Sequence, residues 1–417
     1  MAPSYILFAI PFFFLLMGIE WWVARKQSKQ VYRLNDSINN LVVGIGNRLF
    51  GLVNKGLLIG VAIWIKDHYA IWNIPATWWS FLLALLVFDF LFYWAHRWGH
   101  ELNIFWGAHS VHHQSEEYNL SVALRQSWFH DMLAFPIFMV VPVMGFDVIT
   151  FGSAAALHTI YQFWIHTKTI GRMPDWFEYI FNTPSHHRVH HSINPKYIDK
   201  NHAGVFMFWD RMFGTFQAED SNDEIYYGIT TQLKSWNPAW ANVHYYTEMF
   251  QKAADMKWTD RIKFIWARPG WLPSYLGGYQ APKEVDAKQY AKYDSTTSLP
   301  MVAYGVLQFV ILLTATIQYM RYFSDITLFY KAVFFVLIFI TMLIAGAIFE
   351  NRKWIWYAEY ARLVIAVLFL NIFYYTSFIS WFNVFVVASA IVFLFSVAWF
   401  TYSVLHLKSN ISNYSAQ

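Results

Sequence analysis

Residues 78–100 read WWSFLLALLVFDFLFYWAHRWGH, and this stretch decides what kind of fold the chain can adopt. The part from Trp78 to Ala95 is strongly apolar and close in length to the ~20 residues that a helix needs to cross ~30 Å of hydrocarbon. It continues directly into His96 and His100, whose spacing places both imidazoles on one face of a helix. The stretch therefore predicts a spanning helix that ends in candidate metal ligands.

The composition of the whole chain agrees with a membrane location. Of 417 residues, 57% are hydrophobic and 13% are charged, whereas soluble domains carry about 25% charged residues. The segment Tyr5–Ala24 is predicted to be an anchor, with the basic residues that follow it in the cytoplasm. Further apolar segments are Met132–Gly145, Phe151–Ile165 and four C-terminal spans, Pro300–Met320, Thr327–Glu350, Trp354–Thr376 and Trp381–Leu405.

Two segments have a mixed character. Asn47, Arg48, Asn54 and Lys55 interrupt the apolar run Leu41–Ile65, which predicts a helix packed against protein or lying at the interface. The polar, aromatic and proline-broken stretch from Arg172 to Ser298 predicts a membrane-facing cap of short helices and loops. Strand patterns are few, so the predicted fold is all-α: a polytopic membrane helical bundle with a histidine-rich cap on the cytosolic side.

Charge and cysteine content exclude several classes of protein. The net charge is +4, and no long run of Lys or Arg indicates a nucleic-acid partner. The absence of cysteine excludes disulfides, thiolate metal sites and iron–sulfur clusters. The candidate metal ligands are therefore the histidines.

The candidate metal-binding histidines lie mainly in three short groups at helical spacings. The groups are His96 and His100; His109, His112 and His113; and His186, His187, His190 and His191, with His166 at the end of an apolar segment. A single buried histidine is more often a core residue. Three groups beside membrane spans would, however, be costly to bury as bare polar side chains. We therefore predict that these histidines bind metal.

The number of imidazoles indicates two ions, because ten ligands exceed what one six-coordinate ion can take. Imidazole suits zinc, iron, copper and nickel, so ligand type alone leaves the metal open. Glu101 beside His100 is a candidate carboxylate that supports the ligands. We interpret the isolated histidines as ordinary core or surface residues and leave His202 open; the isolated ones are His68, His130, His158, His244 and His406.

The three histidine boxes resemble the HxxxH, HxxHH and HHxxHH motifs of the fatty acid hydroxylase/sterol desaturase superfamily. Within it, the sequence is similar to the alkylglycerol monooxygenase branch over residues 89–219. The resemblance is carried by HRWGHELNIFWGAHSVHHQSEEYNLSVALRQS (96–127), YQFWIHT (161–167) and NTPSHHRVHHSINPKYIDKNHAGVFMFWDRMFGTFQAE (182–219). Weaker likeness continues through RPGW (268–271) and the terminal spans.

The resemblance implies a non-haem di-iron monooxygenase with tetrahydrobiopterin as reductant. Hydroxylation of the ether-linked carbon of an alkylglycerol would give a hemiacetal that falls apart into aldehyde and glycerol. Glu101 matches a functionally important acidic position of the branch, whereas His202 stands where tyrosine is usual and Ser192 replaces glycine. The implied iron ligands are His96, His100, His109, His112, His113, His166, His187, His190 and His191, with His186 as a tenth.

Polar residues after the second box are candidates for binding the head group of the lipid, while an apolar pocket would take its tail. They are Glu116, Glu117, Asn119, Arg125 and Gln126. Two alternatives stay open: a hydroxylase or desaturase of fatty acyl chains, sterols or carotenoids, and a histidine-lined metal transporter. A transporter would place its polar residues near the bilayer midplane. The boxes lie at span ends instead, which favours an enzyme.

We divide the chain into N-terminal membrane anchor helices (1–75), a histidine-box hydroxylase domain (76–220), an aromatic-rich cap or linker (221–298) and C-terminal transmembrane helices (299–417). The expected partners are a lipid substrate, O₂ and the membrane itself. The expected active site faces the cytosol, at the endoplasmic reticulum of a eukaryote or the inner membrane of a bacterium.

Overall fold

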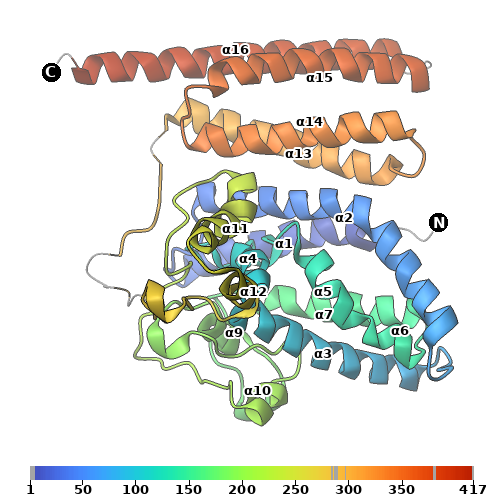
Figure 1. The fold of residues 1–417 in the computed structure, drawn as a ribbon. Helices are drawn as coiled ribbons and strands as arrows, with labels where there is room; N and C mark the ends of the chain where they lie inside the picture. Colours follow the sequence, from blue (N-terminus) through green and yellow to red (C-terminus); the bar gives the residue numbers. More distant parts are fainter. Residues whose placement is uncertain (1–4, 283–284, 286–289, 296, 379–381, 416–417) are drawn as a thin grey trace. The chain divides into compact units, whose positions relative to one another are not determined.

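The computed structural model describes the chain apart from residues 1–4, 283–284, 286–289, 296, 379–381 and 416–417 (Figure 1). In the described residues, the regular secondary structure is helical, with two isolated β-bridges and no strand. The predicted all-α fold is therefore confirmed. The chain forms two units: the histidine unit, Phe8–Leu233 with Trp240–Lys292, and the C-terminal unit, which falls within Met1–Leu7, Lys234–Ala239 and Tyr293–Gln417.

Helix α3 (Trp78–Glu101) is the central element of the histidine unit. It begins at Thr77, where the Thr77 and Ser80 hydroxyls accept hydrogen bonds from each other's backbone N–H groups and so cap the first turn. It packs against α4 (Asn103–His113) and α7 (Val148–Trp164). The other helices of this part are α1 (Tyr5–Lys26), α2 (Leu34–Tyr69), α5 (His130–Phe138) and α6 (Val140–Met144).

A glycine turn joins α6 to α7. Gly145 has a φ of 95°, and a Cβ on it would lie 1.6 Å from the carbonyl oxygen of Trp72. Only glycine fits this position without moving the backbone. Asp147 then caps α7 by accepting hydrogen bonds from Ile149 N and Thr150 N. The turn fixes the direction in which α7 carries His166 back toward α3.

Short helices and loops make up the rest of the histidine unit, as the proline-rich sequence predicts. They include α8 (Asp175–Ile180), α9 (Pro184–His190), α10 (Phe208–Phe213) and α12 (Trp258–Trp266). Helix α11 (Pro238–Ala254) is the longest of them. Helix α9 starts with Pro184 at its first turn, where the missing N–H of proline is no loss.

The C-terminal unit consists mainly of four long helices: α13 (Leu299–Tyr322), α14 (Leu328–Phe349), α15 (Ile355–Ser377) and α16 (Phe382–Ser415). The predicted C-terminal spans thus correspond to these helices. Their shared core contains Tyr304, Ile348 and Phe400. A buried ion pair between Arg362 and Glu359 adds a polar contact to it, with Gln308 accepting a further hydrogen bond from Arg362 at 2.7 Å.

Among the described residues, six helices are long and apolar enough to cross a membrane: α2, α3, α13, α14, α15 and the part of α16 up to Leu407. The protein is therefore an integral membrane protein. The sequence predicted that the segment within helix α2 packs against protein or lies at the interface. The structure agrees with this prediction only for the first half of α2. Asn40 and Asn47 are buried there, whereas Val53 and Leu57 are exposed further along. With 36 residues, α2 is long enough to pack against the protein in its first half and to expose apolar side chains in its second half.

Candidate metal centre

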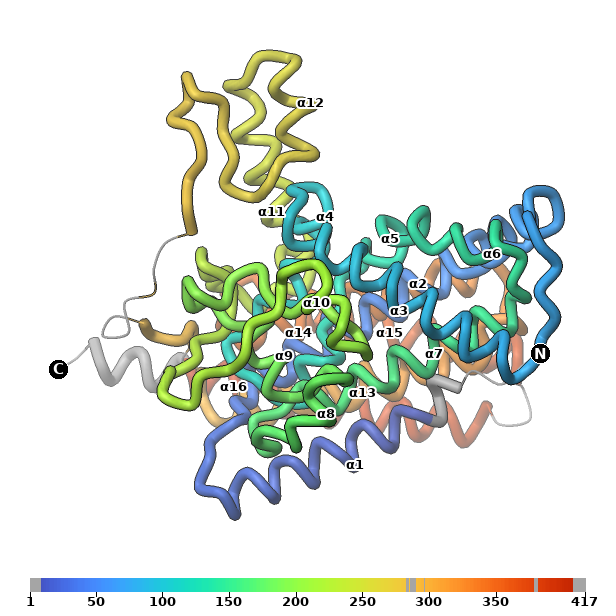
Figure 2. Tube along the Cα trace, turned by 90° about the horizontal axis from the view of Figure 1, so that it is seen from below, coloured from blue at the N-terminus to red at the C-terminus, as the bar shows by residue number. Residues whose placement is uncertain are grey.

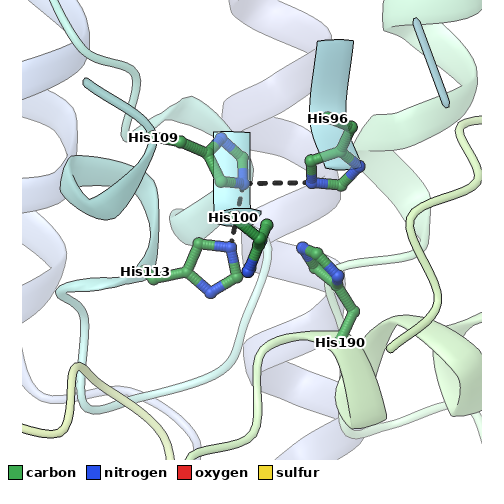
Figure 3. A group of neighbouring side chains, drawn as sticks. All are labelled: His96, His100, His109, His113 and His190. Atoms are coloured by element: carbon green, nitrogen blue, oxygen red, sulfur yellow. Dashed lines mark hydrogen bonds between the residues drawn. The ribbon is translucent and has the colours of Figure 1, made fainter. Parts of the chain in front are cut away.

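Nine of the ten predicted histidines come together in two adjoining groups. The five-histidine group contains His96, His100, His109, His113 and His190, and the four-histidine group contains His112, His166, His187 and His191. Within each group, one ring nitrogen per residue lies within 4.8 Å of all the others. Figure 3 shows the five-histidine group, whose rings turn toward one another. The groups touch through His113 and His191, whose ring centroids are 4.3 Å apart.

Two helices contribute to both groups. On α4, His109 and His113 are four residues apart and join the five-histidine group, while His112 joins the other. Around α9, His187 and His191 join the four-histidine group, while His190 points to the five-histidine group. Successive residues of a helix point about 100° apart, so each helix lies between the two groups and supplies both.

Backbone carbonyls hold the outward-facing Nδ1 atoms. His96 Nδ1 lies 2.7 Å from the carbonyl oxygen of His202, and His190 Nδ1 lies 3.0 Å from that of Lys200. His112 Nδ1 is 2.9 Å from the carbonyl of Arg125, and His166 Nδ1 is 2.7 Å from that of Gln162. A carbonyl only accepts, so each of these rings carries its proton on Nδ1 and turns a lone pair on Nε2 inward.

The inward lone pairs face one another. His112 Nε2 and His166 Nε2 are 3.2 Å apart, and His166 Nε2 is 3.0 Å from His187 Nε2. Burial lowers the pKa of His112 to about 4 and, together with His112, holds the pKa of His166 well below its usual range. The rings are therefore neutral at pH 7, and no proton can bridge His112 and His166. Two opposed lone pairs repel unless a cation lies between them.

The spacing also fits a metal ion. Metal–imidazole bonds of about 2.1 Å place neighbouring octahedral ligands about 3 Å apart. In the five-histidine group, His109 Nε2 is 3.0 Å from His96 Nε2 and 3.1 Å from His113 Nε2. The buried Nε2 atoms of His100 and His190 have no hydrogen-bond partner among the described residues. The donor set therefore suits two metal ions.

One loop, residues 199–203, orients much of the five-histidine group. Besides the two carbonyls named above, the Asp199 carboxylate lies 3.5 Å from His100 Nδ1. Asp199 and Asn201 have positive φ values of 57°, which brings these acceptors to one side. The Asp210 carboxylate fastens the loop by accepting hydrogen bonds from the N–H groups of His202 and Ala203 at 2.8 and 2.7 Å. We call residues 199–203 the histidine loop.

His202 lies at the edge of the five-histidine group without belonging to it. Its ring centroid is 5.1 Å from that of His100 and 5.8 Å from that of His96. Its Nε2 lies 3.2 Å from the Asp199 carbonyl, whereas its buried Nδ1 has no partner among the described residues. His202 therefore presents a spare lone pair beside the metal centre.

Two predicted residues lie outside both groups. His186 faces Glu178, with 3.7 Å between His186 Nε2 and the Glu178 carboxylate, so it supports the fold of α8 and α9. Glu101 is at the end of α3, where Arg97 and Arg268 contact its carboxylate at 3.2 and 3.0 Å. The carboxylate in contact with His100 belongs to Asp199, a residue that the sequence did not single out.

The predicted head-group residues are largely engaged within the protein. Arg125 donates to Val111 O, Asn39 Oδ1 and Gln114 Oε1 at 2.7, 2.5 and 2.5 Å, and its own carbonyl orients His112. Glu117 pairs with Arg33 and Lys292, each at 2.7 Å. Asn119 donates to Val31 O at 2.6 Å, and Glu116 contacts Arg33 at 3.5 Å. Gln126 lies 3.5 Å from His112 Nδ1 and is partly exposed.

The sequence analysis did not identify a buried acid–histidine pair that supports the two histidine groups. Asp89 on α3 contacts His158 on α7 at 2.8 Å, and His158 in turn contacts the side chain of Gln162 at 2.9 Å. Gln162 is the residue whose carbonyl orients His166. The signal was present: Asp89 is a lone acid inside the apolar stretch quoted first, and such residues are expensive in a membrane helix. His68, His130, His244 and His406 lie outside both groups.

The fold and the site define a class: an all-helical integral membrane protein with two adjoining groups of histidines that could hold metal ions. Residues 81–215 match the sequence profile of the family described as Fatty acid hydroxylase. The chain is 34% identical to alkylglycerol monooxygenase of Homo sapiens over 84% of this chain and 79% of that protein. It is 36% identical to the Danio rerio enzyme over 75% and 70%, respectively, and 34% identical to the Xenopus tropicalis enzyme over 76% and 71%.

No solved structure matches the chain significantly. The family profile and the extent of these matches agree with each other, and the chain belongs to the fatty acid hydroxylase family. The resemblance read from the histidine boxes is thereby confirmed.

Proposed function

We propose that this chain is a membrane-bound non-haem di-iron oxygenase that hydroxylates a lipid, with O₂-dependent cleavage of the ether bond of an alkylglycerol as its reaction. The broader part, an oxidoreductase that acts on lipid, follows from the family and the relatives of the chain. The iron pair, the ether substrate and the mechanism are the proposal.

The convergence of nine histidines in two groups, with opposed lone pairs on His112 and His166, carries the proposal. One ion would be held by the five-histidine group and the other by the four-histidine group. Nine nitrogens leave about three of the twelve positions of two six-coordinate ions for ligands from solution. When bound, iron supplies the oxidising power toward a C–H bond that amino-acid side chains lack.

The residues of the chain itself position and shield the site. The carbonyls of Arg125, Gln162, Lys200 and His202 fix the ring orientations in advance, so little reorganisation is needed when the site is loaded. The nine histidines are buried, which excludes bulk water from the reacting carbon. Gln126, partly exposed beside His112, is the retained candidate for contacting the head group.

The substrate and reductant rest on the relatives. Alkylglycerol monooxygenases are among the relatives that cover most of the chain, which supports an alkylglycerol as substrate. Tetrahydrobiopterin as reductant is the proposal that follows from the resemblance of the histidine boxes. Glu101, oriented by Arg97 and Arg268, is proposed as the catalytic carboxylate on the cytosolic side. Hydroxylation of the ether carbon yields a hemiacetal, which falls apart into an aldehyde and glycerol.

Purification of the full chain followed by metal analysis and an oxygen-uptake assay tests this function. We expect two iron ions per chain, O₂ consumption with an alkylglycerol plus tetrahydrobiopterin, and equal amounts of aldehyde and glycerol. A glycerol ester of the same chain length is the matched control and yields no aldehyde. Hydroxylated or desaturated acyl chains without ether cleavage would support the acyl alternative. Metal flux into liposomes without O₂ uptake would support a transporter instead.

A further inference from the structure

Helix α12 (Trp258–Trp266) carries an apolar stripe that faces away from the protein. Trp258, Ile262 and Trp266 are 72%, 48% and 58% exposed. Their spacing of four residues places all three on one side of the helix. Phe264 on the opposite side is buried against Met249 and Met256. The packing of α12 therefore uses one face and leaves a second apolar face largely exposed, with one ring contact between Trp266 and Phe105 at its end.

The position of α12 is fixed by the end of a membrane span. Asn103, two residues beyond the last residue of α3, donates its backbone N–H to Ala267 O at 2.9 Å and its side-chain amide to Phe264 O at 2.8 Å. Arg268 contacts Glu101, the last residue of α3, at 3.0 Å. The apolar part of α3, Trp78–Ala95, is long enough to span the hydrocarbon, so the polar end of the helix that follows lies in the headgroup region. Helix α12 is held at the same depth.

Figure 2 shows α12 and the end of α11 projecting to one side of α3 and α4. The lobe formed by α12 and the end of α11 would therefore extend along the membrane surface. The rows flanking the apolar stripe are basic: Arg261 lies on one side and Lys263 on the other, with Lys257 at the start of the helix. Tryptophan at the level of lipid head groups, beside cations that attract anionic lipid, is the composition of an interfacial helix.

We propose that α12 lies in the headgroup region of the leaflet in which α3 ends, with Trp258, Ile262 and Trp266 toward the acyl chains. The partner is anionic phospholipid, because basic residues flank the stripe and because the surface continues the membrane boundary set by α3. The inference rests on the membrane location and is independent of the reaction proposed above.

The test uses the absence of cysteine from the natural chain, which allows a single probe to be placed without a background. A nitroxide is attached to the new cysteine of the full-length Ile262→Cys variant. The labelled protein is reconstituted in nanodiscs of zwitterionic lipid or of mixed zwitterionic and anionic lipid. Accessibility of the nitroxide to O₂, which concentrates in lipid, is compared with accessibility to a water-soluble nickel chelate. Leu57→Cys, exposed on α2, serves as the lipid control, and Ser221→Cys, in an exposed turn, serves as the water control.

We expect the label at 262 to favour O₂, as the label at 57 does, and to move deeper by a measurable amount when anionic lipid is added. The double variant Lys257→Glu with Lys263→Glu should abolish the response to anionic lipid, while the circular dichroism spectrum stays unchanged. A label at 262 that is as accessible to nickel as the label at 221, in both lipid compositions, overturns the proposal. A lipid-facing label with no response to anionic lipid overturns the choice of partner.

Discussion

The two histidine groups are alike in ligand type but differ in what holds them. The five-histidine group depends on a loop: residues 199–203 supply acceptors to His96, His100 and His190. The four-histidine group depends on packed elements: His166 is oriented by Gln162 of α7, and His112 by Arg125, whose guanidinium donates hydrogen bonds to four neighbours. A loop opens at lower free energy than packed helices do. The two metal positions should therefore differ in how firmly they retain an ion.

Removal of one ligand from each group should have the largest effect. We expect His190→Ala to lose the ion of the five-histidine group and His166→Ala that of the four-histidine group, so that metal content falls from two to one per chain. Each variant should lose at least about 100-fold in activity, because removing even a supporting residue costs 10–100-fold. Metal analysis and O₂ uptake measure both effects. His68→Ala, outside the groups, is the control. Loss of both ions in either variant would show that the groups load as one unit.

Asp210→Ala should weaken the five-histidine group alone. The variant removes the acceptor that fastens the N–H groups of His202 and Ala203, so the histidine loop loses its anchor. We expect about 10–100-fold weaker binding of one ion, seen as earlier loss during titration with a chelator. Asp220→Ala, in an exposed ion pair with Lys196, is the matched control. Equal weakening of both ions would contradict a separate role for the loop.

Arg125→Lys should affect the four-histidine group instead. Lysine cannot reproduce the four hydrogen bonds of the guanidinium, so the carbonyl of residue 125 is less firmly placed behind His112. We expect about tenfold weaker binding of one ion and a loss of about 2 kcal/mol in the free energy of unfolding. Chelator titration and thermal unfolding report these changes. Arg321→Lys in the C-terminal unit controls for the exchange of side chains. If Arg125→Lys weakened binding of the same ion that Asp210→Ala releases, the assignment of Arg125 to the four-histidine group would be refuted.

His202→Tyr should have the smallest effect. The His202 ring is close to the five-histidine group but is not one of its members. We therefore expect both ions to be retained and activity to change by less than about tenfold. Metal analysis measures how many ions are retained, and electronic spectra of the cobalt-substituted protein report a change in their ligands. Loss of one ion, or a changed ligand field, would make His202 a ligand.

The sequence was informative where chemistry depends on side-chain type and spacing. The spacing of His109, His112 and His113 predicted that imidazoles would converge, and the apolar run before His96 predicted the spanning helix that carries it. The division of the nine into five and four was not predicted, because it depends on how α4 and α9 are rotated about their axes. The carbonyls of Lys200 and His202 were beyond reach for a different reason: every residue has one, and only the fold decides which faces a histidine.

The contacts that the charged residues make could not be read from their places in the sequence. Glu117 and Arg125 follow the second box and were assigned to the substrate, but both are buried and contact other parts of the chain. Glu101 was chosen as the acid nearest in sequence to His100, whereas Asp199, nearly a hundred residues away, makes the contact. Proximity along the chain is a poor guide to which acid meets a helix end, because loops bring distant residues there.

The uncharged ligand set has an electrostatic consequence. Imidazole ligands are neutral, so each divalent ion held by the two groups would keep its full double charge inside the fold. Asp199, in contact with His100, offsets little of it. Removing an electron from either ion would add positive charge to a region already rich in it, which would raise the reduction potential and favour the reduced form of a bound pair. The same excess charge would draw anions into the open coordination positions.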